Sequence, residues 1–126
     1  MNIKNDKVLR ATGFTLVEIM VVMAIIGLLA AIAIPNFVRA RASGQADACI
    51  NNLRQIDSAA QQFAVEQHKI TGDAISYPDD LTPYIRLNAN RSIPPCPAGG
   101  VYTCGTVGKS PTCSLSNSTT PPHVLH

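Results

Sequence analysis

One carboxylate stands alone in the most apolar part of the chain, and an acid in that setting needs a partner. Residues 14–34 form a run of 21 residues in which Glu18 is the only charged side chain. At about 1.5 Å per residue, a helix of this length crosses the roughly 30 Å hydrocarbon core of a bilayer. A carboxylate at the centre of such a helix costs about 2.5–3.5 kcal/mol, and less near its end. Glu18 is either a tolerated acid near the interface of a membrane anchor or an acid with a function in lipid.

The residues around Glu18 favour the second interpretation. In order, they are Gly13-Phe14-Thr15-Leu16-Val17-Glu18. A basic leader precedes them, and Pro35 ends the apolar run. This pattern resembles the processing site of prepilins, the precursors of type IV pilins and of the pseudopilins of type II secretion. The resemblance covers residues 1–35 closely, and it is specific because the glycine, phenylalanine, glutamate and proline all stand at the required spacing.

The resemblance implies how the chain is processed and what it assembles with. A membrane-embedded prepilin peptidase is expected to cut after Gly13 and to methylate the new amino terminus at Phe14. Helices of identical and related subunits are then expected to pack into a filament core, where Glu18 neutralises the amino terminus of a neighbouring Phe14. Pro35 corresponds to the proline that ends the first apolar block of these proteins. Assembly is expected to need an inner-membrane platform and a separate cytoplasmic ATPase.

Two kinds of filament stay open. A pseudopilin builds a short periplasmic piston that pushes folded proteins through an outer-membrane secretin. A type IV pilin builds a surface fibre for adhesion, motility or DNA uptake. The small head and residues 95–102, with the sequence PCPAGGVY, resemble short pseudopilin-like proteins, so the pseudopilin of a type II secretion system is favoured.

The charge distribution predicts the topology. Three basic side chains against one acidic side chain give residues 1–13 the whole net charge of +2, which places the leader in the cytoplasm and the head in the periplasm. The remainder is neutral, so no nucleic acid partner is expected. A secretory signal peptide cut after Ala33 is the remote alternative, because residues 31–33 read Ala-Ile-Ala. However, the apolar core of a signal peptide has only about 7–15 residues, and this run is longer and contains an acid.

Four cysteines lie in the exported part: Cys49, Cys96, Cys104 and Cys113. A head of roughly 58 residues is small enough to need covalent staples, so disulfides are expected. Of the three pairings, two are favoured: Cys104–Cys113 with Cys49–Cys96, or Cys96–Cys113 with Cys49–Cys104. Zinc is the other use of four cysteines, but no C-x₂-C spacing is present, and disulfides are preferred.

No set of residues predicts catalysis. The histidines His68, His123 and His126 are not spaced as metal ligands, and the two in the tail are expected to be solvated. No nucleophile stands with a base and an orienting acid, and there is no glycine-rich phosphate loop. Asp79 and Asp80 suggest calcium, but oxygen ligands at calcium-loop spacing are absent, so helix capping and solvation are expected. We therefore expect the substrate of an enzyme and not an enzyme, with no cofactor and no metal.

The elements that position these residues follow from hydrophobic periodicity. Residues 14–34 predict a transmembrane helix, and residues 35–68 predict its amphipathic continuation, kinked or broken at Pro35. Apolar side chains recur every three or four residues along one face of this second half. They are Cys49, Leu53, Ile56, Ala60 and Phe63. This stripe must pack on something, and the rest of the chain is the obvious cover.

The head, residues 69–126, is expected to cover the stripe. Gly72 serves as a C-cap or loop residue, and a short helical turn capped by Asp79 lays apolar side chains on the long helix. Residues 101–104 and 112–115 predict a loose hairpin, followed by a flexible or extended tail. The predicted fold class is α+β and type IV pilin-like: a long N-terminal helix whose second half is covered by a small, poorly stranded head.

Overall fold

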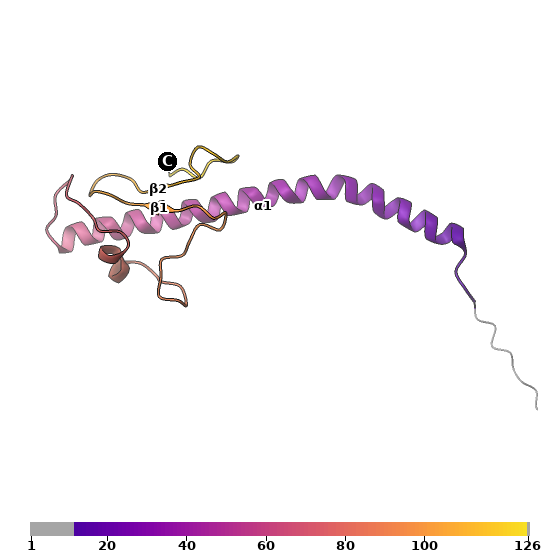
Figure 1. Cartoon of the computed structure of the whole chain (residues 1–126), viewed down its shortest axis with the longest axis horizontal. Helices are drawn as coiled ribbons and strands as arrows, with labels where there is room; N and C mark the ends of the chain where they lie inside the picture. The colour runs from indigo at the N-terminus through magenta and orange to yellow at the C-terminus, as the bar shows by residue number, and fades with distance from the viewer. Residues whose placement is uncertain (1–11, 126) are drawn as a thin grey trace, which may run out of the picture. The chain divides into compact units, whose positions relative to one another are not determined.

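The computed structural model describes residues 12–125, which belong to two compact units divided after Phe37. The elements are helix α1 (Leu16–Glu66), the 3₁₀ helix η1 (Asp79–Tyr84) and strands β1 (Tyr102–Thr103) and β2 (Thr112–Cys113) (Figure 1). The α+β class, with a long N-terminal helix and a small, sparsely stranded C-terminal region, is confirmed. The leader up to residue 11 and His126 lie outside the described residues.

Helix α1 contains Pro35 and does not end there. A proline inside a helix removes one backbone donor and crowds the carbonyl four residues earlier. Of the two outcomes expected at Pro35, a break is therefore excluded, because α1 is assigned without interruption over 51 residues. The loss of one hydrogen bond is small beside the many backbone bonds that remain on either side.

The described part of the first unit, residues 12–37, consists of the start of α1 and has almost no cover within the chain. Its large apolar side chains are exposed, for example Leu16 at 75% and Leu28 at 68%. Its most apolar 18-residue window has a mean hydropathy of 2.8, and α1 is the one helix within residues 12–125 that is long and apolar enough to cross a membrane. A helix satisfies its own backbone groups, which lipid cannot do. These side chains therefore need lipid or other helices around them.

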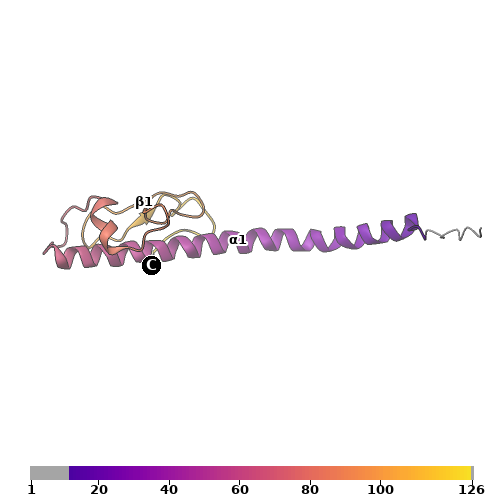
Figure 2. The same ribbon diagram turned by 90° about the horizontal axis from the view of Figure 1, so that it is seen from below.

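The second unit buries the predicted stripe. The α1 side chains that it covers comprise the five predicted ones and three alanines: Ala46, Cys49, Leu53, Ile56, Ala59, Ala60, Phe63 and Ala64. They pack against side chains of the later segments, which lie along the end of α1 in both views (Figures 1 and 2). The stripe is thus covered by the rest of the chain, as predicted.

Helix α1 ends in a Schellman motif. The N–H of Lys69 donates to the carbonyl of Ala64 (2.8 Å), and the N–H of His68 donates to that of Val65 (3.4 Å). His68 takes the left-handed conformation (φ 52°) that this motif requires. Gly72 (φ +100°) comes later, as a loop residue whose N–H donates to the carbonyl of Val107 (2.9 Å).

The short helical turn after the loop is confirmed, but its predicted cap is wrong. The N-cap of η1 is Pro78 and has no side-chain capping bond. The carboxylate that serves the backbone here is that of Asp80, which accepts the N–H of Ser76 (2.8 Å). Leu81 is fully buried, and the ring of Tyr84 meets that of Phe63 edge to face at 6.2 Å. The 3₁₀ turn therefore lays its apolar side chains on α1, as expected.

The predicted hairpin is present, with shorter strands. β1 and β2 are antiparallel, with Tyr102 opposite Cys113 and Thr103 opposite Thr112. The first pair is buried, and the second is exposed with its hydroxyl groups 2.7 Å apart. The pairing therefore turns Cys113 toward the core, where its sulfur takes part in the cluster described below.

Candidate functional site

The start of α1 holds Glu18 in a capping box. The N–H of Thr15 donates to Glu18 Oε2 (2.8 Å), and the N–H of Glu18 donates to Thr15 Oγ1 (3.3 Å). This reciprocal pair satisfies two backbone donors that a helix start leaves free. The sequence signal for it, a threonine three residues before a glutamate, was present and not used in the prediction. The capping box holds the Glu18 carboxylate against the backbone of Thr15, the residue between Phe14 and the start of α1.

Gly13 is exposed, and the fold gives no reason for a glycine there. Its backbone does not adopt a left-handed conformation, and nothing lies within 4 Å of where a Cβ would stand. Phe14 is also exposed, at 87%. Any requirement for a small residue at position 13 must therefore come from a partner molecule and not from the packing of this chain.

The expected disulfides are not confirmed. All four cysteines lie among the described residues, and each is a buried free thiol. Three of the thiols meet one imidazole instead. The ligand atoms of Cys49, Cys96, Cys113 and His123 all lie within 4.8 Å of one another. We call these four side chains the Cys₃His cluster.

Cys104 is not part of the Cys₃His cluster. Burial, with the carboxylate of Asp57 adding to it, raises the pKa of the Cys104 thiol. His123 was expected to be solvated, and this prediction is wrong: its side chain is 2% exposed, and Nδ1 lies 3.4 Å from Cys96 Sγ. The segment after Leu115 therefore packs at least one side chain into the head.

The thiol pKa values of Cys49 and Cys96 are shifted in opposite directions. Burial raises the pKa of the Cys49 thiol to about 12, so this thiol is protonated at neutral pH in the metal-free protein. Burial also acts to raise the pKa of the Cys96 thiol, but the backbone N–H groups of Ala98 and Gly100 and the thiols of Cys49 and Cys113 together lower it. Backbone donors aimed at a sulfur favour its thiolate form.

Gly100 fits the cluster because it has no side chain. A Cβ at this position would stand 2.5 Å from Cys113 Sγ and 3.1 Å from Leu115 Cγ. The sulfur of Cys113 therefore occupies the space that any other residue at position 100 would fill.

We expect Gly100→Ala to destabilise the head by about 1–3 kcal/mol, because Cys113 must move to admit the methyl group. Gly105→Ala is the matched control, since nothing lies within 4 Å of that position and its backbone is not left-handed. The stability of both variants is measured by urea denaturation of the full chain in detergent, monitored through the circular dichroism of the tyrosines in the head. Equal midpoints for the two variants would contradict the packing described here.

Comparison with known proteins agrees with the resemblance of the N-terminal pattern to prepilins. The family model of the prokaryotic N-terminal methylation motif matches residues 9–34. The type IV major pilin protein PilA of Myxococcus xanthus (strain DK1622) is 45% identical over 60 residues, which are 48% of this chain and 27% of that protein. The N-terminal methylation segment of this chain is thus similar to that of type IV pilins and pseudopilins.

Two further proteins match over similar lengths. A fimbrial protein of Pseudomonas aeruginosa is 40% identical over 62 residues, covering 49% of this chain and 40% of that protein. The type II secretion system core protein G of Escherichia coli (strain K12) is 33% identical over 56 residues, covering 44% and 39%. The matches thus span less than half the length of each relative. No solved structure matches the chain significantly.

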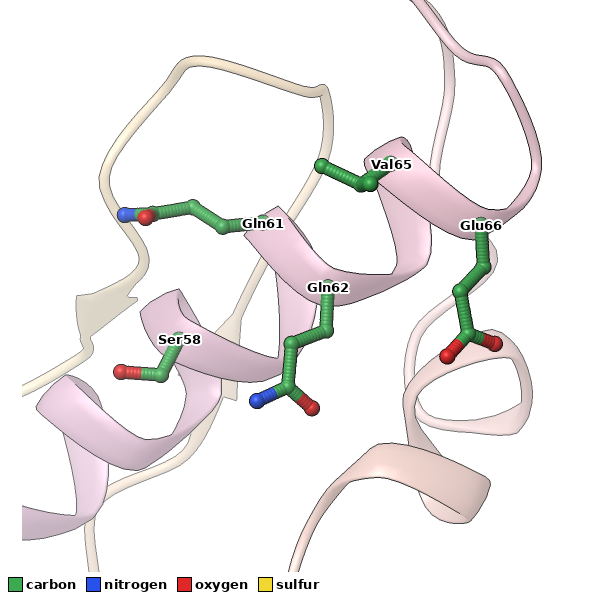
Figure 3. A pocket seen from close by; sticks show the side chains of 5 residues that line it. All are labelled: Ser58, Gln61, Gln62, Val65 and Glu66. Atoms are coloured by element: carbon green, nitrogen blue, oxygen red, sulfur yellow. The ribbon is translucent and has the colours of Figure 1, made fainter.

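One open hollow lies on the second unit. Figure 3 shows the five α1 side chains that line it: Ser58, Gln61, Gln62, Val65 and Glu66. Its volume is about 360 Å³, and all five side chains are exposed. A site that holds a small molecule normally encloses it. This hollow does not, and its lining offers no combination of a nucleophile and a base.

Proposed function

We propose that this chain is a processed, membrane-anchored subunit of a pilin-like filament, polymerised through its N-terminal helix. One observation carries the proposal: α1 begins with an uncovered apolar face that contains a single carboxylate, directly after the pattern at residues 13–18. Such a face is suited to lipid before assembly and to the helices of other subunits afterwards. The similarity to named pilins and to a secretion-system core protein supports the same proposal.

The proposed role of Glu18 is to pair with a subunit's amino terminus. Residues 14–34 contain no lysine, arginine or histidine, so this segment has no cationic side chain to pair with the acid. Cleavage after Gly13 creates an ammonium group at Phe14. Glu18 Oε2 is bonded to the N–H of Thr15, which leaves Oε1 to accept from the Phe14 ammonium of a neighbour. Where water is excluded, that pair is strong and an unpaired charge is costly, so the pairing sets the register between subunits.

The proposed topology places the leader in the cytoplasm and the head in the periplasm. The basic leader supports this orientation through the positive-inside rule. The partners that follow are a prepilin peptidase, an inner-membrane assembly platform, membrane lipid, and identical or related subunits. Pro35, exposed inside α1, is proposed to shape the helix where it packs in the filament.

Within this family we propose a pseudopilin of a type II secretion system. The small head supports it, since the second unit has only two strands of two residues each among its described residues. A type IV pilin of a surface fibre is the second candidate, and the higher identity to the Myxococcus pilin favours it. Deletion in the source bacterium separates them. A pseudopilin's loss stops secretion of folded proteins, whereas a pilin's loss removes surface fibres.

Processing is tested first. Co-expression with a prepilin peptidase should yield a mature chain that begins at a methylated Phe14, and Gly13→Val should block the cleavage because a side chain keeps the scissile bond from the peptidase. Amino-terminal sequencing or intact mass measures both. Gly27→Val is the control, since this glycine also has nothing within 4 Å of an added Cβ, and it should be processed normally. A mature chain that begins at Ile34 would instead identify an ordinary signal peptide.

A further inference from the structure

The Cys₃His cluster gathers four metal-binding groups from four separate segments. Cys49 comes from α1, Cys96 from the loop before β1, Cys113 from β2 and His123 from the segment after it. Their exposed fractions are 0%, 4%, 2% and 2%. The four ligand atoms lie within 4.8 Å of one another and are all buried in the second unit, so they form an internal site and not a group on the surface.

The dimensions of the cluster suit tetrahedral zinc. With Zn–S bonds near 2.3 Å and Zn–N bonds near 2.0–2.1 Å, two sulfurs in such a site lie about 3.8 Å apart, and a sulfur and a nitrogen about 3.5 Å. Cys96 Sγ and His123 Nδ1 are 3.4 Å apart, which already suits a common zinc ion. No two of the four ligand atoms are more than 4.8 Å apart, so the widest pair must approach by at most about 1 Å. Three thiolates and one imidazole are a donor set that zinc takes in structural sites.

The loop around Cys96 makes a tight backbone turn. The N–H of Gly99 donates to the carbonyl of Cys96 (2.9 Å), and Gly99 takes a left-handed conformation (φ +86°). Burial acts to raise the pKa of the Cys96 thiol, and the backbone N–H groups of Ala98 and Gly100 act to lower it. Such donors compensate part of the negative charge that three thiolates bring to one zinc ion.

Two neighbouring side chains fix the position of Cys49 and of the loop. The amide of Asn52, one turn after Cys49 on α1, donates to the hydroxyl of Tyr102 (3.1 Å) and to the carbonyl of Pro95 (3.4 Å). Burial raises the pKa of the Cys49 thiol, and the Tyr102 hydroxyl acts in the opposite direction. The Asn52 bonds join α1, the loop and β1 around the cluster, so its shape does not depend on the cysteines alone.

A disulfide explains the cluster less well than a metal does. Any disulfide among the three sulfurs uses two of them and leaves a buried thiol beside a buried imidazole. Cys104, which both predicted pairings require, is not one of the four groups. A single zinc ion uses all four groups at once.

We propose that Cys49, Cys96, Cys113 and His123 bind one Zn²⁺ ion that ties the loop, the hairpin and the C-terminal segment to α1. Binding releases three thiol protons and leaves the site with a net charge of −1. The proposal is independent of the proposed filament function. Its consequence is that a head with a small core takes part of its stability from a metal, as small domains do.

The first experiment measures metal and thiols in the full chain, purified in detergent without chelators or reductants. Elemental mass spectrometry should find one zinc per chain, and alkylation after denaturation with a chelator should find four free thiols. Replacing zinc with Co²⁺ should give the visible absorption of a tetrahedral site with thiolate-to-cobalt charge transfer. Chelation should lower the melting temperature of the head.

Variants with matched controls locate the site. His123→Gln should lose most of the bound zinc, whereas His68→Gln, at an exposed histidine, should keep one equivalent. Cys49→Ser should lose zinc, whereas Cys104→Ser, at a buried cysteine outside the cluster, should keep it. His123→Cys should retain the metal with a shifted cobalt spectrum. That result separates loss of a ligand from failure to fold.

Two results would overturn the proposal. The first is a disulfide between any two of Cys49, Cys96 and Cys113, found by peptide mapping of the unreduced protein. The second is a folded wild-type chain with four free thiols, no zinc and no tetrahedral cobalt spectrum.

Discussion

Glu18→Ala is expected to leave the amount of processed subunit in the membrane unchanged or higher, and to abolish or sharply reduce filament formation. The first effect follows because the substitution removes a charge from the lipid-facing run. The second follows because the incoming subunit loses the partner for its ammonium group at Phe14, and an unpaired charge in a water-excluded filament core costs several kcal/mol. Filament yield is measured by shearing and sedimentation at matched levels of membrane-bound subunit.

Two comparisons sharpen this experiment. Glu18→Asp keeps the charge on a shorter side chain and should give an intermediate yield. Thr15→Ala removes the hydroxyl from the capping box but leaves the carboxylate, so it should weaken the start of α1 by about 1 kcal/mol and keep most of the assembly. Equal filament yields for wild type and Glu18→Ala would make Glu18 a tolerated interfacial acid and remove the electrostatic basis of the proposed register.

Leu53→Ala should destabilise the head by about 2–5 kcal/mol. Leu53 is fully buried, one turn from Cys49 on the stripe, where α1 is covered by the later segments. Truncation removes apolar contacts and leaves a cavity that the surrounding helix and loops can only partly fill. The midpoint of urea denaturation of the full chain in detergent reports the change.

Val65→Ala provides the matched control on the same helix. Val65 is 76% exposed, and a substitution at such a position usually changes stability by less than about 0.5 kcal/mol. The helical circular dichroism of residues 14–34 should persist in both variants, because none of these residues packs in the buried core. If both variants lost the same stability, the division of α1 into a covered and an uncovered face would be wrong.

Much of the fold was predictable because its signals are local. The long α1, the buried stripe at Cys49, Leu53, Ile56, Ala60 and Phe63, and the pairing of residues 102–103 with 112–113 each follow from a period of 3.6 or 2 residues. The N-terminal pattern at residues 13–18 is local too, and it lies within the segment that the family model of the N-terminal methylation motif matches. The errors among local signals were small: Pro78 stands where Asp79 was expected to cap, and the capping box of Thr15 and Glu18 was overlooked.

The Cys₃His cluster was decided by tertiary structure alone. The sequence offers four cysteines without a zinc-knuckle spacing and a histidine in a polar tail, so spacing favoured disulfides and a solvated imidazole. Yet Cys96 and His123, 27 residues apart, have ligand atoms 3.4 Å from each other. The reason is that packing the loop, β2 and the C-terminal segment onto one face of α1 sets which side chains meet. A local pattern records a residue's neighbours in sequence, whereas the packing of the later segments on α1 decides which buried side chains meet. Cys104 is buried too, yet it lies outside the cluster, and His123 lies within it.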